Sequence, residues 1–199
     1  MGWIGVLCIS MTVGAASPKA HPTGFNQDMR KLWEDHITWT RLYIVNALND
    51  LPSKESTADR LLRNQAEIGD AFKPFYGNEA GQKLTSLLRD HVLIAAEVID
   101  AAKAEDPAKQ KNASDRWYKN SDDIAVFLGG LNPRNWPPAD MRAMLREHLD
   151  TTSEEVSDGL NKDWVSDIQA YDRLHGQILK MADVLSAGVI KQFPEKFEK

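Results

Sequence analysis

The chain lacks most of the residues and motifs that mark the common functional classes. Its 199 residues include one cysteine, Cys8, which excludes a disulfide framework, a thiolate zinc site, an iron–sulfur cluster and a cysteine nucleophile in the body of the protein. Basic side chains number 24 against 29 acidic ones, and the resulting net charge of −5 argues against nucleic acid as a partner. The chain also has no P-loop, Gly-x-Gly-x-x-Gly, Gly-x-Ser-x-Gly or His-Glu-x-x-His motif. Its motifs therefore indicate no particular reaction.

Charged residues are missing from the amino-terminal segment 3–16, which is mostly apolar and ends in small residues. This pattern predicts a secretory signal peptide over residues 1–16, although no Lys or Arg precedes the apolar run. We expect a disordered segment over 17–26 and an exported protein, either periplasmic or secreted. The apolar run is too short to span a bilayer, and we expect no membrane span after signal cleavage.

The body of the chain predicts helices, because apolar residues recur there at a spacing of three to four. Asn-Gly or Asp-Gly turns between alternating segments, which would indicate a sheet, are missing. We expect an all-α, antiparallel up-down bundle of about six helices over residues 27–192, with a tail at 193–199. The expected helices span about 27–50, 53–73, 79–104, 106–130, a segment from 137 onward, and 163–191.

Short strings recur along the body at a nearly constant interval. The string Leu87–His91 returns as Met144–His148, and Leu32–His36 is a looser copy, so that the histidines stand 55 and 57 residues apart. The string that begins at Asn64 returns 56 residues later at Asn120. This repeat predicts three tandem helical hairpins of about 56 residues each.

The repeat also predicts that polar residues share one level of the bundle. Two residues equidistant from the turn of an antiparallel hairpin lie at the same height. The pairs His36/Asn64, His91/Asn120 and His148/His175 are centred on positions 50, 105.5 and 161.5, each within a turn-like segment. Every one of these histidines is three, four or seven residues from apolar neighbours, which is typical of an inward-facing position.

Two interpretations of this polar level remain open. In the first, inward-facing histidines bind a transition metal ion (zinc, copper, iron or nickel) or a small ligand. The expected ligands are His36, His91, His148 and His175, with Asn64, Asn120, Glu67, Asp123 and Asp172 in supporting positions. In the second, the protein is a structural or interaction module of the cell envelope whose His/Asn pairs only determine helix register. An enzyme is the third and least favoured class. A ferritin-like di-iron site is not expected, since it needs two Glu-x-x-His segments and only Asp172–His175 approximates one.

Three strings, at 35–41, 64–77 and 84–91, resemble an uncharacterised family of exported bacterial helical proteins. The similarity extends over about residues 30–185 and implies a shared histidine pattern. Some members of that family carry the labels acetylglutamate kinase or glycosyltransferase. The sequence supports neither label, because such a kinase needs an α/β core with glycine-rich phosphate loops and this chain has no strand–glycine–helix unit. The resemblance therefore implies no catalytic residue.

Overall fold

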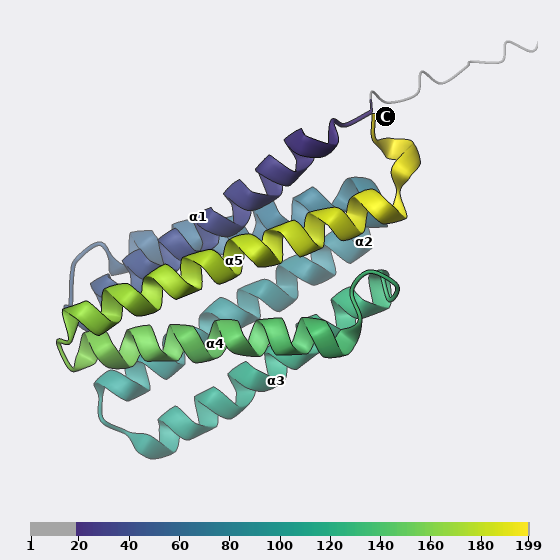
Figure 1. The fold of residues 1–199 in the computed structure, drawn as a ribbon. Helices are drawn as coiled ribbons and strands as arrows, with labels where there is room; N and C mark the ends of the chain where they lie inside the picture. Colours follow the sequence, from purple (N-terminus) through teal and green to yellow (C-terminus); the bar gives the residue numbers. More distant parts are fainter. Residues whose placement is uncertain (1–18, 199) are drawn as a thin grey trace, which may run out of the picture.

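The computed structural model describes residues 19–198, which are almost entirely helical (Figure 1). The helices are α1 (Pro22–Leu48), α2 (Lys54–Lys103), α3 (Pro107–Leu131), α4 (Pro138–Leu160) and α5 (Trp164–Gln192), followed by a short 3₁₀ helix, η1 (Pro194–Lys196). The predicted signal peptide lies outside the described residues. Within residues 19–198, none of the helices combines the length and the apolar character needed to cross a bilayer. The all-helical class expected from the periodicity is confirmed.

Residues 19–198 form five α-helices where the sequence predicted about six. The two helices expected over 53–73 and 79–104 are joined in α2, and Gly77 is the residue at which the dihedral angles leave the helical region (φ 86°, ψ 166°). The residues on both sides of Gly77 remain helical, so the chain bends there without a loop. In Figure 1 the second arm of α2 runs back from this bend. A Cβ atom built on Gly69 would lie 2.6 Å from the carbonyl oxygen of Gly81, so the two arms pack backbone to backbone.

The contacts between the helices form a closed ring. Each of α1 to α4 packs against the next helix in the chain, and α5 packs against both α4 and α1. The connections α1–α2, α2–α3 and α4–α5 contain Asp50, Glu105 and Lys162, three non-glycine residues with positive φ angles of 52°, 52° and 60°. All three residues coincide with the turn positions inferred from the sequence.

Local signals explain where several helices begin. Asp106 accepts a hydrogen bond from the backbone N–H of Lys109, and Pro107 occupies the first position of α3, where a missing N–H costs nothing. Asp163 caps α5 in the same way by accepting from the N–H of Ser166. These caps satisfy N–H groups that a helix leaves unpaired at its first turn.

Both ends of the described chain are more ordered than the sequence suggested. The helix α1 begins at Pro22 rather than near 27, and the expected tail contains η1 and the buried Phe197. Phe197 lies 5.4 Å from Phe25 and 5.6 Å from Phe75 between ring centroids. This aromatic contact holds the two ends of the described chain together, which short-range periodicity does not reveal.

Candidate functional site

Three histidines from three different helices meet inside the bundle. His36 on α1, His91 on α2 and His148 on α4 have exposed fractions of 3%, 5% and 3%. The ring of His148 is adjacent to both others, with centroid separations of 5.7 Å to His36 and 6.0 Å to His91. They are placed there because each follows an apolar stripe on its helix, so that the same helix face buries both the stripe and the imidazole.

A side-chain amide from the adjacent helical segment holds each histidine-bearing helix. Asn64, Asn120 and Gln177 donate to the backbone carbonyls of Leu32, Leu87 and Met144, at 3.0, 3.1 and 2.8 Å. Each of these carbonyls belongs to the residue four positions before a histidine of the cluster. The three bonds therefore determine the height of each histidine relative to its neighbouring helix.

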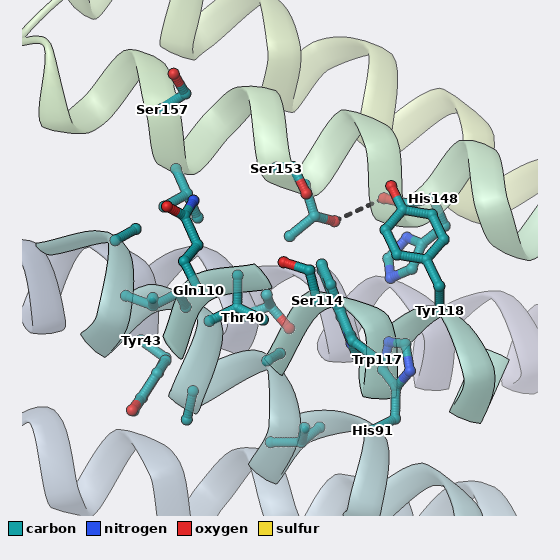
Figure 2. A pocket seen from close by; sticks show the side chains of 18 of the residues that line it. Thr40, Tyr43, His91, Gln110, Ser114, Trp117, Tyr118, His148, Ser153 and Ser157 are labelled. Carbon is teal, nitrogen blue, oxygen red and sulfur yellow. Dashed lines mark hydrogen bonds between the residues drawn. The ribbon is translucent and has the colours of Figure 1, made fainter. Parts of the chain in front are cut away.

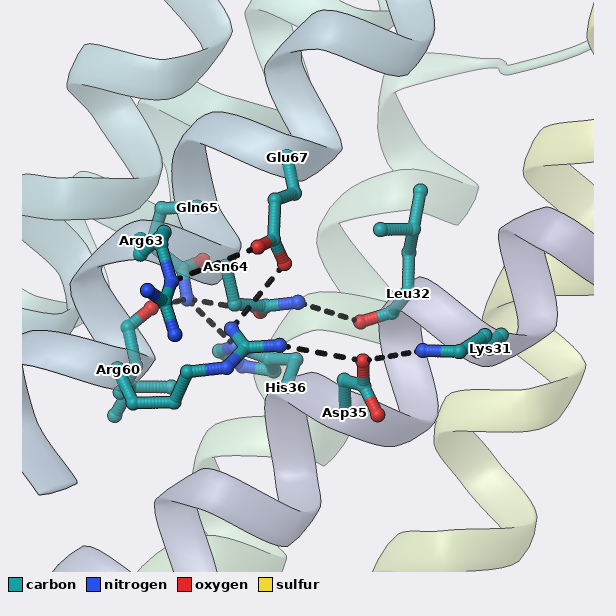
Figure 3. A network of polar contacts seen from close by, with 10 residues as sticks. Lys31, Leu32, Asp35, His36, Arg60, Arg63, Asn64, Gln65 and Glu67 are labelled. Carbon is teal, nitrogen blue, oxygen red and sulfur yellow. Dashed lines mark hydrogen bonds and ion pairs between the residues drawn. The ribbon is translucent and has the colours of Figure 1, made fainter.

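The ring nitrogens Nδ1 have three different environments. Nδ1 of His91 lies 3.0 Å from Oδ1 of Asn120, which is the pairing that the sequence predicted. Nδ1 of His36 lies 3.2 Å from Nε2 of Gln65, which takes the place of the predicted partner Asn64 (Figure 3). The side chain of Asn64 bonds instead to the backbone of Leu32 and to Gln65. Nδ1 of His148 is buried and has no hydrogen-bond partner among the described residues.

His175 does not join the cluster. Its side chain is 37% exposed, and Nε2 lies 3.0 Å from Oε1 of Glu34 at the surface. Gln177, two residues further along α5, takes the inward position that was expected for His175. Two residues turn a helix by about 200°, which exchanges the inner face for the outer one. The interval from His91 to Asn120 is 29 residues and equals that from His148 to Gln177, so this spacing was the signal that could have identified Gln177.

The carboxylates expected near the cluster lie elsewhere. Glu67 is partly exposed and pairs with Arg60 at 3.2 Å, as Figure 3 shows, and Asp123 pairs with Lys119 at 2.7 Å on the surface of α3. Asp172 is exposed on α5. The histidines thus have amides rather than acids as their polar neighbours.

Burial keeps the three imidazoles neutral. It lowers the pKa of His36 to about 3, with a further contribution from the nearby His91. Burial also lowers the pKa of His91 to about 4, against a smaller opposing effect of the Asn120 hydrogen bond. The pKa of His148 falls well below its ordinary value because the ring is buried and faces both other histidines. At neutral pH the cluster therefore offers uncharged nitrogen donors and acceptors.

A cavity of about 350 Å³ opens beside the imidazoles (Figure 2). His91 and His148 lie at one end with Trp117, while Tyr43, Gln110 and Ser157 lie toward the other. The apolar lining comes from Leu61, Val92, Ala95, Ala96, Val98, Ile99, Ala102, Val156 and Leu160. Serine and threonine hydroxyls supply most of the remaining polar groups, and no Asp, Glu, Lys or Arg of the described chain belongs to the lining. The cavity thus suits a partly apolar, uncharged molecule.

The spacing of the imidazoles differs from that of a metal centre. Within residues 19–198, no group of three or more His, Cys, Asp or Glu side chains is arranged to hold a metal ion. The imidazoles do have the neutral state that metal coordination requires. However, they are spaced as a lining around a cavity rather than as a closed coordination shell.

One buried ionic cluster was missed from the sequence. Arg41 on α1 donates to both carboxylate oxygens of Asp167 and, at 2.9 Å, to Oε1 of Glu155. Oε2 of Glu155 is buried without a partner among residues 19–198, and burial raises the pKa of this carboxyl to about 7 despite the opposing effect of Arg41. The three residues come from three helices and have no common sequence spacing, so no periodic pattern links them.

Comparison of the chain with protein-family models, with curated proteins and with solved structures finds no match.

Proposed function

We propose that this protein binds a small, uncharged organic molecule in the cavity beside His36, His91 and His148, without catalysing a reaction. The observation that carries the proposal is the cavity itself, which combines three neutral imidazoles with an apolar wall and a lining to which the described chain contributes no charged side chain. An ionic ligand in this cavity would be buried without a counter-charge, which costs several kcal/mol. A neutral molecule with an apolar body and a few polar atoms meets no such cost.

The condition of His148 supports a binding role over a purely structural one. A histidine retained only to determine helix register is expected to have both ring nitrogens satisfied. Nδ1 of His148 instead lies buried and unpaired among the described residues, at a cost of roughly 1–3 kcal/mol. Residues kept at the expense of stability are typical of functional sites.

A transition metal ion is the second candidate ligand. It is favoured by the close approach of three neutral imidazoles. The ring centroid of His148 lies 5.7 Å from that of His36 and 6.0 Å from that of His91. The hydrogen bond from Nδ1 of His91 to Asn120 resembles the support that metal-bound histidines commonly receive. Coordination would still require the rings to move closer together.

The proposal is tested by calorimetric titration of the untagged protein with two neutral aromatic probes, toluene and p-cresol. We expect one probe molecule to bind per chain. Ala95 lines the cavity, so Ala95→Trp should fill it and abolish binding. Val126→Trp is the matched control, because Val126 is 56% exposed on α3 and does not line the cavity.

A parallel titration with Zn²⁺ and Ni²⁺ tests the second candidate. Binding of one equivalent of metal, lost in a folded His91→Ala/His148→Ala double variant, would show that the ligand is a metal ion rather than an organic molecule. A protein that binds neither the probes nor the metals would overturn both proposals and leave the structural or interaction module.

From residues 1–16 we also propose that the protein acts after export.

A further inference from the structure

The protonated nitrogen of His91 follows from its amide partner. Nδ2 of Asn120 donates to the carbonyl of Leu87 at 3.1 Å, which determines the orientation of the amide. Oδ1 of Asn120 therefore faces Nδ1 of His91, at 3.0 Å, as an acceptor. Two acceptors do not form a hydrogen bond, so Nδ1 carries the proton. In the neutral ring, Nε2 of His91 is then left with a free lone pair.

The same reasoning gives His36 the opposite tautomer. Nε2 of Gln65 donates to the carbonyl of Leu61 at 2.8 Å and lies 3.1 Å from Oδ1 of Asn64. Turning the Gln65 amide around would place its oxygen against these two oxygens, so the NH₂ group must be the end that faces Nδ1 of His36, at 3.2 Å. The two hydrogens of this NH₂ group are shared among three acceptors, and a proton on Nδ1 would place a donor against a donor. Nδ1 of His36 is therefore an acceptor, and its proton resides on Nε2.

One cavity thus contains an imidazole N–H donor, from His36, and an imidazole lone-pair acceptor, from His91. A metal ion would need a lone pair from both rings, and a carboxylate would need a donor from both. A hydroxyl group satisfies both nitrogens, because its O–H donates while its oxygen accepts. We propose that the ligand is a neutral alcohol or phenol whose hydroxyl donates to Nε2 of His91 and accepts from Nε2–H of His36. This inference rests on the proposed function of the cavity.

The size and the lining of the cavity indicate what the rest of the ligand is like. Its volume of about 350 Å³ corresponds to roughly ten water molecules at their liquid volume, and hence to a ligand of about ten non-hydrogen atoms. Val92, Ile99 and Val156 give it an apolar wall. Trp117, whose ring lies 5.4 Å from that of His91, adds an aromatic surface beside the polar end. A hydroxyl on a compact apolar or aromatic body fits these features.

The tautomers are tested directly by ¹⁵N NMR of the histidine side chains in the wild-type protein at neutral pH. We expect His36 to be protonated on Nε2 and His91 on Nδ1. This measurement needs neither a ligand nor a variant. The same tautomer in both rings would overturn the inference whatever the cavity binds.

The ligand class is tested by comparing p-cresol with toluene, which has no hydroxyl, and with anisole, whose oxygen only accepts. We expect p-cresol to bind about tenfold more tightly than either, because only its hydroxyl can donate to Nε2 of His91 while it accepts from His36. Gln65→Met removes the donor that determines the His36 tautomer and should abolish this preference. Asn132→Leu is the matched control, since Asn132 is also buried and also donates to a backbone carbonyl, that of Gly188 at 2.9 Å, but follows α3 and does not line the cavity.

The outcomes separate the two proposals. Equal affinity for the three probes would overturn the hydroxyl assignment and leave the binding cavity intact. Loss of the preference in both Gln65→Met and Asn132→Leu would also overturn the assignment, because packing rather than tautomer would then be responsible. If none of the probes binds to the wild-type protein, the proposed function itself fails.

Discussion

Glu155 shares a single cation with a second carboxylate. Arg41 binds both Asp167 and Glu155, and Glu155 is fully buried with one oxygen unpaired in the described structure. Two carboxylates around one guanidinium leave a net negative charge in a region of low dielectric. Protonation of Glu155 relieves this charge, which is why its pKa is raised to about 7.

We predict that Glu155→Gln stabilises the protein at alkaline pH. A raised folded-state pKa means that stability is present below the ordinary pKa near 4.5 and is lost as the pH rises to about 7. Glutamine does not titrate, so the variant should exceed the wild type by roughly 1–3 kcal/mol at pH 8 and match it near pH 4.5. Urea unfolding at the two pH values measures the difference. A variant that is less stable at pH 8 would show that the ionised pair with Arg41 is stabilising.

At the scale of the element, Gly77 determines the path of α2. Its dihedral angles lie in a region that is essentially restricted to glycine, and they let the chain turn without a loop. The close approach of Gly69 to Gly81 then brings the two arms together near the bend. His91 on the second arm owes its position opposite α1 to this change of direction.

We predict that Gly77→Ala costs roughly 1–3 kcal/mol of stability through backbone strain alone. No atom of the described chain lies within 4 Å of the position that a Cβ would take at Gly77, so steric overlap adds nothing. Gly176→Ala is the control, since Gly176 is exposed within α5, has equally open surroundings and should gain about 0.5–1 kcal/mol. Thermal unfolding of both variants distinguishes the cases. A harmless Gly77→Ala would mean that α2 can straighten or shift its bend.

At the scale of the whole molecule, three buried histidines make the fold sensitive to acid. They come from α1, α2 and α4, so protonation of the cluster places positive charge where three helices pack together. All three have a pKa below the ordinary value near 6.5 because they are buried. The unfolded chain therefore takes up protons that the folded protein does not, and stability falls as the pH decreases below about 6.5.

We predict an acid unfolding transition between about pH 6 and pH 4 in the metal-free protein, followed by far-UV circular dichroism. His148→Leu removes one buried titrating ring and also the unpaired Nδ1, so its transition should move to lower pH. His175→Gln changes a histidine at the surface and should leave the transition in place. An unchanged transition in His148→Leu would assign the acid sensitivity to other groups.

The regular spacing of the turns also belongs to this scale. The positive-φ residues Asp50, Glu105 and Lys162 are 55 and 57 residues apart, the same intervals as those between His36, His91 and His148. The amide bonds to the carbonyls four residues before each histidine repeat in step with them. This agreement supports the predicted internal repeat, which remains a prediction.

Short-range sequence determined the helical class, the turn positions near residues 50, 105 and 162, and the burial of three of the four chosen histidines, because periodicity, caps and breakers act within a few residues. Tertiary structure alone decided that α2 continues through Gly77. It also selected Gln65 over Asn64 beside His36 and Gln177 over His175 on the inner face of α5, positions that a common interval of 29 residues marks in the sequence but that helix height does not. Each residue along a helix turns its side chain by about 100°, so small differences in helix phase reassign a partner that height alone cannot specify. The cavity depends on α1, α2, α3 and α4 together, since it is the volume that their side chains leave unfilled.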